Sequence, residues 1–226
     1  MKRGKFEAEK SARPMVPQAS TPKSTAEKGT EVPVAKSKSA GGKETILVYL
    51  HDLVYLFAII MVLLLVFFRI VVVSGPSMKN TLLDGDYLLT VSSTFYWDPK
   101  PGDIVVISKQ SFDNGEPIIK RVIATEGQKV DIDFSAGIVY VDDKPLDEGY
   151  VNTPTNYPEG VSFPLTVDKG CIFVMGDNRN SSKDSRDPEI GMIDKREVLG
   201  KVLFLVFPGT DGGKVSRQFN RIGAFF

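Results

Sequence analysis

Residues 53–73 read LVYLFAIIMVLLLVFFRIVVV, and this stretch divides the chain of 226 residues into two unequal parts. It contains a single charged residue, Arg69, and as a helix it would be about 31 Å long, which matches the hydrocarbon core of a bilayer. A buried core helix and a cleaved signal sequence are the alternatives, but the length and uniformly apolar composition favour a membrane span. We therefore predict a transmembrane helix over residues 53–73, with the long side chain of Arg69 reaching the interface.

The residues before this segment, 1–45, are rich in Lys, Ser, Thr, Glu, Pro, Ala and Gly and have almost no large apolar side chains. Such a composition cannot bury enough surface to offset the entropy lost on ordering, so we predict a disordered tail. Residues 1–52 carry ten Lys or Arg against six Asp or Glu. A basic excess just before a transmembrane helix predicts that the tail is cytoplasmic and that the remainder of the chain lies outside.

The residues after the segment, 74–226, contain short apolar runs rich in β-branched side chains and separated by Gly, Pro, Asn and Asp. This pattern is typical of strands joined by turns, and no stretch here shows sustained helical periodicity. The predicted fold class is all-β: one antiparallel β domain on a single N-terminal transmembrane helix. The predicted strands are 87–91, 104–108, 118–125, 129–132, 138–141, 171–175 and 198–207.

Composition excludes several classes of function. The chain carries 28 basic and 28 acidic residues, whereas nucleic-acid binding requires a clear basic excess, so we predict no nucleic-acid partner. A lone Cys171 excludes an internal disulfide, and its apolar neighbours favour a small buried side chain. The one histidine, His51, precedes the β domain and cannot complete a Ser/His/Asp triad there. No zinc-ligand spacing or glycine-rich phosphate loop is present, so we predict no metal and no cofactor.

A Ser/Lys arrangement remains open, and Ser77 is the candidate nucleophile. Gly75 and Pro76 precede it and favour a tight turn, which can expose a hydroxyl and direct backbone N–H groups at an oxyanion. Ser77 also follows the membrane segment closely, which would place its hydroxyl near the membrane surface. Taken alone, the motif would equally fit an ordinary serine in a surface turn.

Lys120 is the candidate base, because it lies in the predicted strand 118–125. Side chains alternate along a strand, so Lys120 shares a face with Ile118 and Val122. An apolar face removes water from the amine, and desolvation favours the neutral form that can accept a proton from serine. Taken alone, the position would equally fit a lysine at the surface of a strand.

A third polar segment, residues 176–186, reads GDNRNSSKDSR and follows the apolar strand 171–175. Its many donors and acceptors suit a loop that braces its own backbone through Asx-type hydrogen bonds. A solvated polar loop is the alternative interpretation.

Together these three segments resemble the signature boxes of the type I signal peptidases. That family has a Ser-Met pair soon after the membrane anchor, a Lys-Arg pair on a later strand, and a Gly-Asp-Asn-Arg…Ser-x-Asp-Ser-Arg box. This chain has Ser77-Met78, Lys120-Arg121 and residues 176–186 in the same order. The resemblance extends over about residues 50–207 and implies a signal-peptidase-like catalytic β domain.

The resemblance implies that Ser77 is the nucleophile, that Lys120 is the general base, and that Ser182 hydrogen-bonds the amine of Lys120 and orients it. Some relatives place a serine two residues before the nucleophile to bind the oxyanion, and this chain has Gly75 there. We therefore expect the N–H of Ser77, together with that of Gly75, to supply the donors.

The resemblance further implies a charged pair, Asp184 and Arg186, that holds the framework of the site. We expect Asp177 to be structural as well.

The implied function is removal of N-terminal signal peptides from secreted preproteins, after Ala-x-Ala-type sites, on the outer face of the cytoplasmic membrane. The expected partners are signal peptides and the lipid bilayer, with residues 95–97 as a candidate membrane-dipping surface, and the protein is expected to act as a monomer. A protease dedicated to one substrate and a relative of self-cleaving repressors are the enzymatic alternatives; the membrane segment argues against the second. A membrane-anchored binding or assembly protein with an inert signal-peptidase fold is the non-enzymatic alternative.

Overall fold

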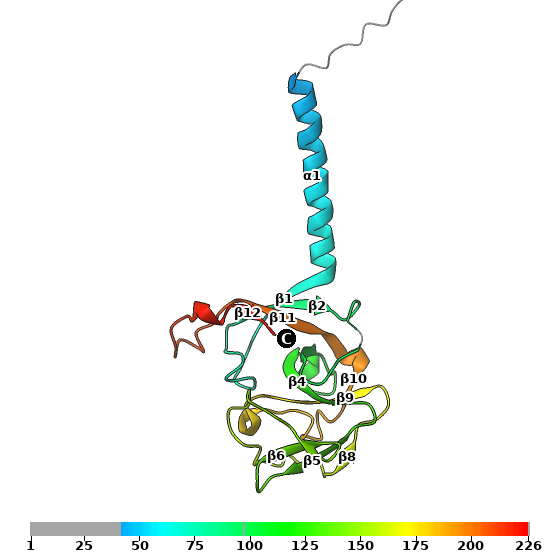
Figure 1. Cartoon of the computed structure of the whole chain (residues 1–226), viewed down its shortest axis with the longest axis vertical. Coiled ribbons are helices and arrows are strands. Elements are labelled where there is room, and N and C mark those ends of the chain that lie inside the picture. The colour runs from blue at the N-terminus through cyan, green and yellow to red at the C-terminus, as the bar shows by residue number, and fades with distance from the viewer. Residues whose placement is uncertain (1–41, 97, 226) are drawn as a thin grey trace, which may run out of the picture. The chain divides into compact units, whose positions relative to one another are not determined.

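The computed structural model describes residues 42–96 and 98–225, and Figure 1 shows a long helix followed by a β domain. The predicted disordered tail, residues 1–45, lies outside the described residues as far as residue 41, and residues 42–45 belong to the helix. Four single-turn 3-10 helices cover Asp113–Gly115, Arg179–Ser181, Lys195–Glu197 and Phe219–Arg221. The longer elements are α1 Gly42–Phe67, β1 Phe68–Val72, β2 Tyr87–Ser92, β3 Ile104–Ile107, β4 Ile118–Thr125, β5 Lys129–Asp133, β6 Ile138–Val141, β7 Lys144–Pro145, β8 Leu165–Thr166, β9 Cys171–Met175, β10 Ile193–Asp194, β11 Val198–Phe207 and β12 Gly223–Ala224.

The helix boundaries differ from the predicted residues 53–73. Within α1, Thr45–Phe67 is long and apolar enough to cross a membrane, with a mean hydropathy of 2.5. The chain then leaves the helix, and β1 pairs with β2 in antiparallel register. The prediction of helix through residue 73 was therefore wrong at its end, because the β-branched residues 70–73 favour an extended backbone that β2 can pair with. Arg69 consequently lies in a strand, opposite Thr90, and not near the end of a helix.

Most of the candidate membrane-dipping residues, 95–97, can be located. Phe95 is 39% exposed and its ring stacks on that of Phe67, with 3.9 Å between centroids. Tyr96 is half-buried, and its hydroxyl donates to Asp103. Trp97 lies outside the described residues. Phe95 is thus the described residue of this set that presents an apolar ring beside α1.

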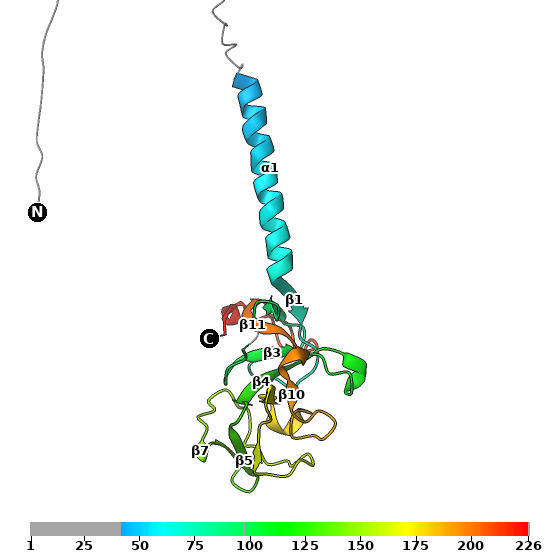
Figure 2. The ribbon, with the colours of Figure 1, turned by 90° about the vertical axis from the view of Figure 1, so that its right-hand side faces the viewer.

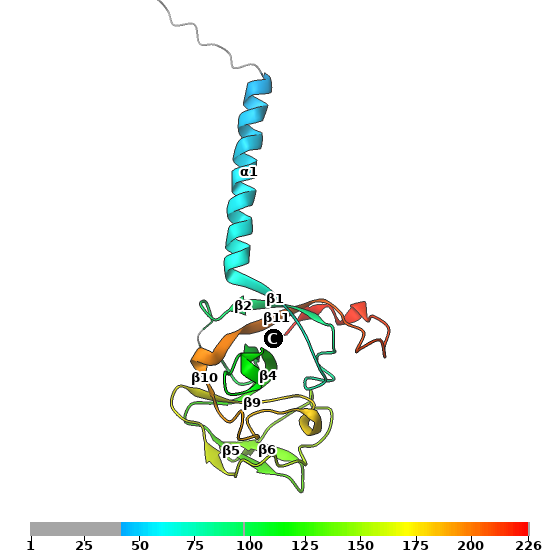
Figure 3. The same cartoon turned by 180° about the vertical axis from the view of Figure 1, so that it is seen from behind.

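Two antiparallel sheets form the β domain, and the seven predicted strands are confirmed to within one residue at each end. The larger sheet has the order β1-β2-β11-β3-β4-β9-β10, with β12 paired to β11, and the smaller has the order β7-β6-β5-β8. Figures 2 and 3 show β5 of the smaller sheet at the end of the β domain opposite β1 and β11. The strand order makes β4 an interior strand of the larger sheet, between β3 and β9.

Three apolar clusters fill the β domain, and β4 contributes to all of them. Ile119 packs with Met78 and Leu82 of the β1–β2 connection. Val122 packs into a second cluster and Ile123 into a third. The register of β4 therefore fixes Lys120 between residues whose side chains are anchored in the core. Met78, which directly follows the candidate nucleophile, is 1% exposed and fixes the β1–β2 connection to the same core.

Candidate active site

The residues 74–86, which connect β1 to β2, carry Ser77 and are referred to here as the nucleophile loop. Gly75 has a φ of +87°, a conformation open to glycine, and its N–H donates to Asp84 Oδ1 at 2.9 Å. A turn follows, with the N–H of Leu82 donating to the carbonyl of Met78 at 2.8 Å. The carbonyl of Ser77 accepts from the N–H of Asn178 at 3.0 Å. Backbone contacts on both sides therefore fix the position of the Ser77 side chain.

The side chain of Lys120, on β4, is in hydrogen-bonding contact with that of Ser77. Its Nζ lies 2.8 Å from Ser77 Oγ and 3.2 Å from the carbonyl oxygen of Ile119. The side chain is almost wholly inaccessible to water, with the residue 3% exposed. Burial lowers the pKa of Lys120 to about 8, although the negative charges of Asp184 and Glu159 act in the opposite direction. A neutral amine in hydrogen-bonding contact with a serine hydroxyl can accept its proton.

Asp177 connects β4, the strand of Lys120, to the nucleophile loop. Its carboxylate accepts two hydrogen bonds from Arg121, at 2.8 Å from Nε and 2.7 Å from Nη2. The hydroxyl of Thr81 donates to the same carboxylate. The guanidinium also lies over the ring of Tyr150, 3.9 Å from its centroid. Because both charges are buried and doubly bonded, the pair sets the separation between β4 and residues 77–81.

Asp184 and Arg186, the charged pair that the family resemblance implies, are in contact and buried. Arg186 Nε and Nη2 each lie 2.8 Å from a carboxylate oxygen of Asp184, and both side chains are fully buried. Asp184 also accepts from the N–H of Gly176 at 2.9 Å, and Arg186 donates to the carbonyl of Arg179 at 2.7 Å. The pair therefore closes the loop 176–186 on itself beside Ser77.

Ser182 is buried beside Ser77 but does not make the expected contact. Its Oγ donates to the carbonyl of Lys183 at 3.4 Å, and within the described ranges no hydrogen bond joins it to Lys120. A Cβ placed on Gly176 would lie 2.2 Å from Ser182 Oγ and 2.5 Å from the carbonyl oxygen of Ser77. Gly176 therefore allows Ser182 and the nucleophile loop to approach each other. Orientation of the amine by Ser182 stays a prediction that would require rotation of its hydroxyl.

The candidate oxyanion donors are not equivalent. The N–H of Gly75 is already bonded to Asp84, so it does not provide the donor that was expected of it. Across residues 42–96 and 98–225, the N–H of Ser77 donates to no acceptor. Of these two backbone N–H groups, that of Ser77 is therefore the one available to bind a carbonyl oxygen of the substrate.

Sequence reasoning assigned no function to two residues that hold the site together, Thr81 and Asn178. Thr81 binds Asp177, and Asn178 binds the nucleophile loop through its N–H and through its side chain, whose Nδ2 donates to the carbonyl of Pro76 at 3.1 Å. Asn178 lies within the motif 176–186, which is a signal for it. No local pattern distinguishes Thr81 from a surface threonine.

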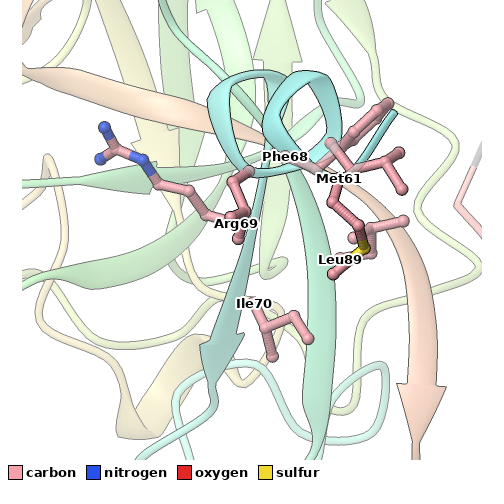
Figure 4. A pocket seen from close by; sticks show the side chains of 7 residues that line it. Met61, Phe68, Arg69, Ile70 and Leu89 are labelled. Atoms are coloured by element: carbon pink, nitrogen blue, oxygen red, sulfur yellow. The ribbon is translucent and has the colours of Figure 1, made fainter. Parts of the chain in front are cut away.

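A large cavity lies away from this constellation. It measures about 890 Å³ and is apolar, and Figure 4 shows it where α1 passes into β1, with the Arg69 guanidinium pointing away from Met61 and Leu89. A second, more polar cavity of about 450 Å³ includes Ser182 and Glu159. Among the described residues, no cluster of three or more His, Cys, Asp or Glu side chains could hold a metal ion. The candidate site is therefore defined by the contact between Ser77 and Lys120 and not by the apolar cavity beside α1.

Comparison with known proteins gives consistent matches. Residues 46–207 match the family described as signal peptidase, peptidase S26. A probable signal peptidase I-1 of Synechocystis sp. is 37% identical over 63% of this chain and 73% of its own length. Signal peptidase I of Bacillus licheniformis is 30% identical over 77% of this chain and 96% of its own length. A solved structure of a signal peptidase I from Enterococcus faecalis is 30% identical, over 46% of this chain and 96% of that one, with a TM-score of 0.38.

Proposed function

Because the chain belongs to the signal peptidase family, peptidase S26, we propose that it removes signal peptides with Ser77 as the nucleophile and Lys120 as the general base. The contact of 2.8 Å between Lys120 Nζ and Ser77 Oγ is the observation that carries this assignment. A lysine whose pKa stays near 10.5 would be charged and could not accept the proton. Burial of Lys120 in the core supports the neutral form.

The reaction is acyl transfer. Lys120 takes the proton of Ser77 Oγ as the oxygen attacks the scissile carbonyl, and the unbonded N–H of Ser77 stabilises the oxyanion. A donor of this kind contributes about 3–4 kcal/mol to the transition state. The protonated amine of Lys120 then gives its proton to the leaving nitrogen. A water molecule activated by the same amine hydrolyses the acyl-enzyme and restores the serine.

The substrate is the extended end of a signal peptide with small residues of the Ala-x-Ala type, which binds as an added strand at a sheet edge. We place residues 1–44 in the cytoplasm, Thr45–Phe67 of α1 in the cytoplasmic membrane and the β domain outside, with a monomer as the active form. Cleavage of a generic Ala-x-Ala peptide distinguishes a general signal peptidase from a protease dedicated to one substrate. An inert binding protein would cleave neither the generic peptide nor a dedicated substrate.

The pH dependence of kcat/KM tests the assignment of the base. The pKa of Lys120 is lowered to about 8, so the neutral amine is present above that value and is lost as the pH falls. The rate of preprotein cleavage is expected to decrease about tenfold for each pH unit below 8. The measurement uses the full chain in detergent between pH 5 and 10, with circular dichroism to verify folding at each pH. A constant rate between pH 6 and 9 would contradict a lysine base.

Replacing Gly176 with alanine is expected to lower kcat by about 100-fold, because the new methyl group would overlap Ser182 Oγ and the Ser77 carbonyl. Something in the site must shift, and the Ser77 carbonyl belongs to the backbone that carries the nucleophile. Gly149→Ala is the matched control, because a Cβ at Gly149 meets no atom within 4 Å. Equal kinetics for the two alanine variants would show that the close approach at Gly176 does not matter for catalysis.

A further inference from the structure

The residues after β11, 208–225, lie beyond the part of the chain that matches the family, which ends at residue 207. They return along β11, with Gly223 opposite Leu205 and Ala224 opposite Phe204. Phe225 packs against the apolar cluster that contains Met78. This C-terminal segment is therefore part of the packed domain and contacts the core beneath the nucleophile loop.

The backbone of the C-terminal segment lies directly against the nucleophile loop. A Cβ on Gly209 would be 2.3 Å from the carbonyl oxygen of Asp84, so the two chains can approach this closely because residue 209 has no side chain. The N–H of Gly209 donates to Asp86 Oδ1 at 2.6 Å, and the N–H of Asp211 donates to the carbonyl of Asp84 at 3.1 Å. These contacts hold the second half of the nucleophile loop.

An ion pair connects the C-terminal segment to the first half of the loop. Lys79 Nζ lies 2.5 Å from Asp211 Oδ2, and Asp211 is only 6% exposed. Lys79 is two residues from Ser77, and its N–H donates to the carbonyl of Pro76 at 3.1 Å in the turn that presents the hydroxyl. A shift of Lys79 would therefore pass through this turn to Ser77.

A second ion pair, between Arg221 and Asp86, holds the end of the same loop. Arg221 contacts both carboxylate oxygens of Asp86, at 3.0 Å from Nη1 and 2.7 Å from Nη2. Its Nη2 also lies 3.2 Å from the carbonyl oxygen of Thr81. Asp86 is fully buried, so its charge depends on these partners. Thr81 is thus bound on one side by Asp177 and on the other by Arg221.

We propose that the C-terminal segment is a clamp that positions the Ser77 hydroxyl for attack, with Asp211 and Arg221 as positioning residues. The inference rests on the proposed function, since it takes Ser77 as the nucleophile. Asp177 and Asn178 hold the nucleophile loop from the side of the matched family region. The C-terminal segment also holds it, through contacts with Lys79, Thr81 and Asp86. Small displacements of a nucleophile lower the rate of the chemical step more than they lower substrate affinity.

Asp211→Asn tests the clamp in the full-length enzyme in detergent, with a purified preprotein as substrate. We expect kcat to fall about tenfold and KM to change by less than about twofold, because the hydroxyl is displaced while the substrate contacts remain. Lys214→Gln is the matched control, because it removes an exposed charge from the same segment. Circular dichroism verifies that each variant is folded.

A double-mutant cycle and a second variant complete the test. If Lys79 and Asp211 act through one ion pair, Lys79→Met combined with Asp211→Asn should lower kcat no further than either change alone. Arg221→Lys, which keeps the charge and loses the two-point contact, should lower kcat about threefold or more with KM unchanged. Wild-type kcat in folded Asp211→Asn and Arg221→Lys would overturn the clamp. Wild-type cleavage by Ser77→Ala would instead overturn the proposed function, so the two failures are distinguishable.

Discussion

Replacing Ser77 with alanine is expected to lower kcat for preprotein cleavage by at least about 10⁴-fold and to leave the fold intact. The reason for the loss is that, in residues 42–96 and 98–225, no other hydroxyl is in hydrogen-bonding contact with the amine of Lys120. The fold should persist because the loop is held through the Ser77 carbonyl and the buried Met78 side chain, neither of which changes. The measurement is single-turnover cleavage of a purified preprotein in detergent.

Ser135→Ala serves as the control for that experiment, since Ser135 is exposed in the connection between β5 and β6. Its cleavage rate should equal that of the wild type. If folded Ser77→Ala also cleaves at the wild-type rate, Ser77 is not the nucleophile. If neither the wild type nor any variant cleaves a preprotein with an Ala-x-Ala site, the inert binding protein becomes the better description.

The strands were predictable wherever a run of apolar and β-branched residues ends at a turn signal, as in β4, β6 and β9. β1 was missed because its residues continue the apolar composition of α1 without interruption, so hydropathy alone cannot separate helix from strand there. The strands β7, β8, β10 and β12 each have two residues, too few to show an alternation. β8, β10 and β12 depend on partners that are distant in sequence, whereas β7 pairs with the adjacent β6 across a tight turn.

The candidate site, like the fold, has features that could be predicted from the sequence and features that could not. The types of residue needed for a Ser/Lys pair could be recognised, but Ser77 and Lys120 are 43 residues apart, and spacing alone does not predict contact across a sheet. It was the resemblance to a family that assigned Ser77 and Lys120 to one site. It did not indicate that the Gly75 N–H is occupied, which depends on the Asp84 side chain. Nor did it reach the C-terminal segment, where Asp211 and Arg221 have the composition of a solvated loop.

Replacing Lys120 with methionine is expected to lower kcat by at least about 10⁴-fold, because methionine cannot accept the proton of Ser77. Methionine has a similar length and suits the apolar surroundings, so the side chain should still fill its place. The measurement is preprotein cleavage between pH 6 and 10, where the wild type gains activity as the pH rises to about 8 and the variant should not. Substantial cleavage by the variant with an unchanged pH profile would exclude Lys120 as the base.

The stability of the same variant should change in the opposite direction. In the unfolded chain the pKa of this lysine is 10.5 and in the folded chain about 8, so at pH 7 folding is opposed by about 3 kcal/mol. Methionine carries no proton and removes this cost, but it loses two hydrogen bonds of about 1 kcal/mol each. The free energy of unfolding should therefore increase by about 1 kcal/mol. Thermal unfolding at pH 7 should therefore occur about 2–4 °C higher. The unfolded chain binds more protons than the folded one between pH 8 and 10.5, so wild-type stability rises with pH and overtakes the variant near pH 9. Lys169→Met, at an exposed lysine, should show neither effect. A folded Lys120→Met that is inactive and less stable at every pH would indicate a structural role for the amine. Inactivity together with greater stability at pH 7 is the result expected of a base that is kept neutral for catalysis.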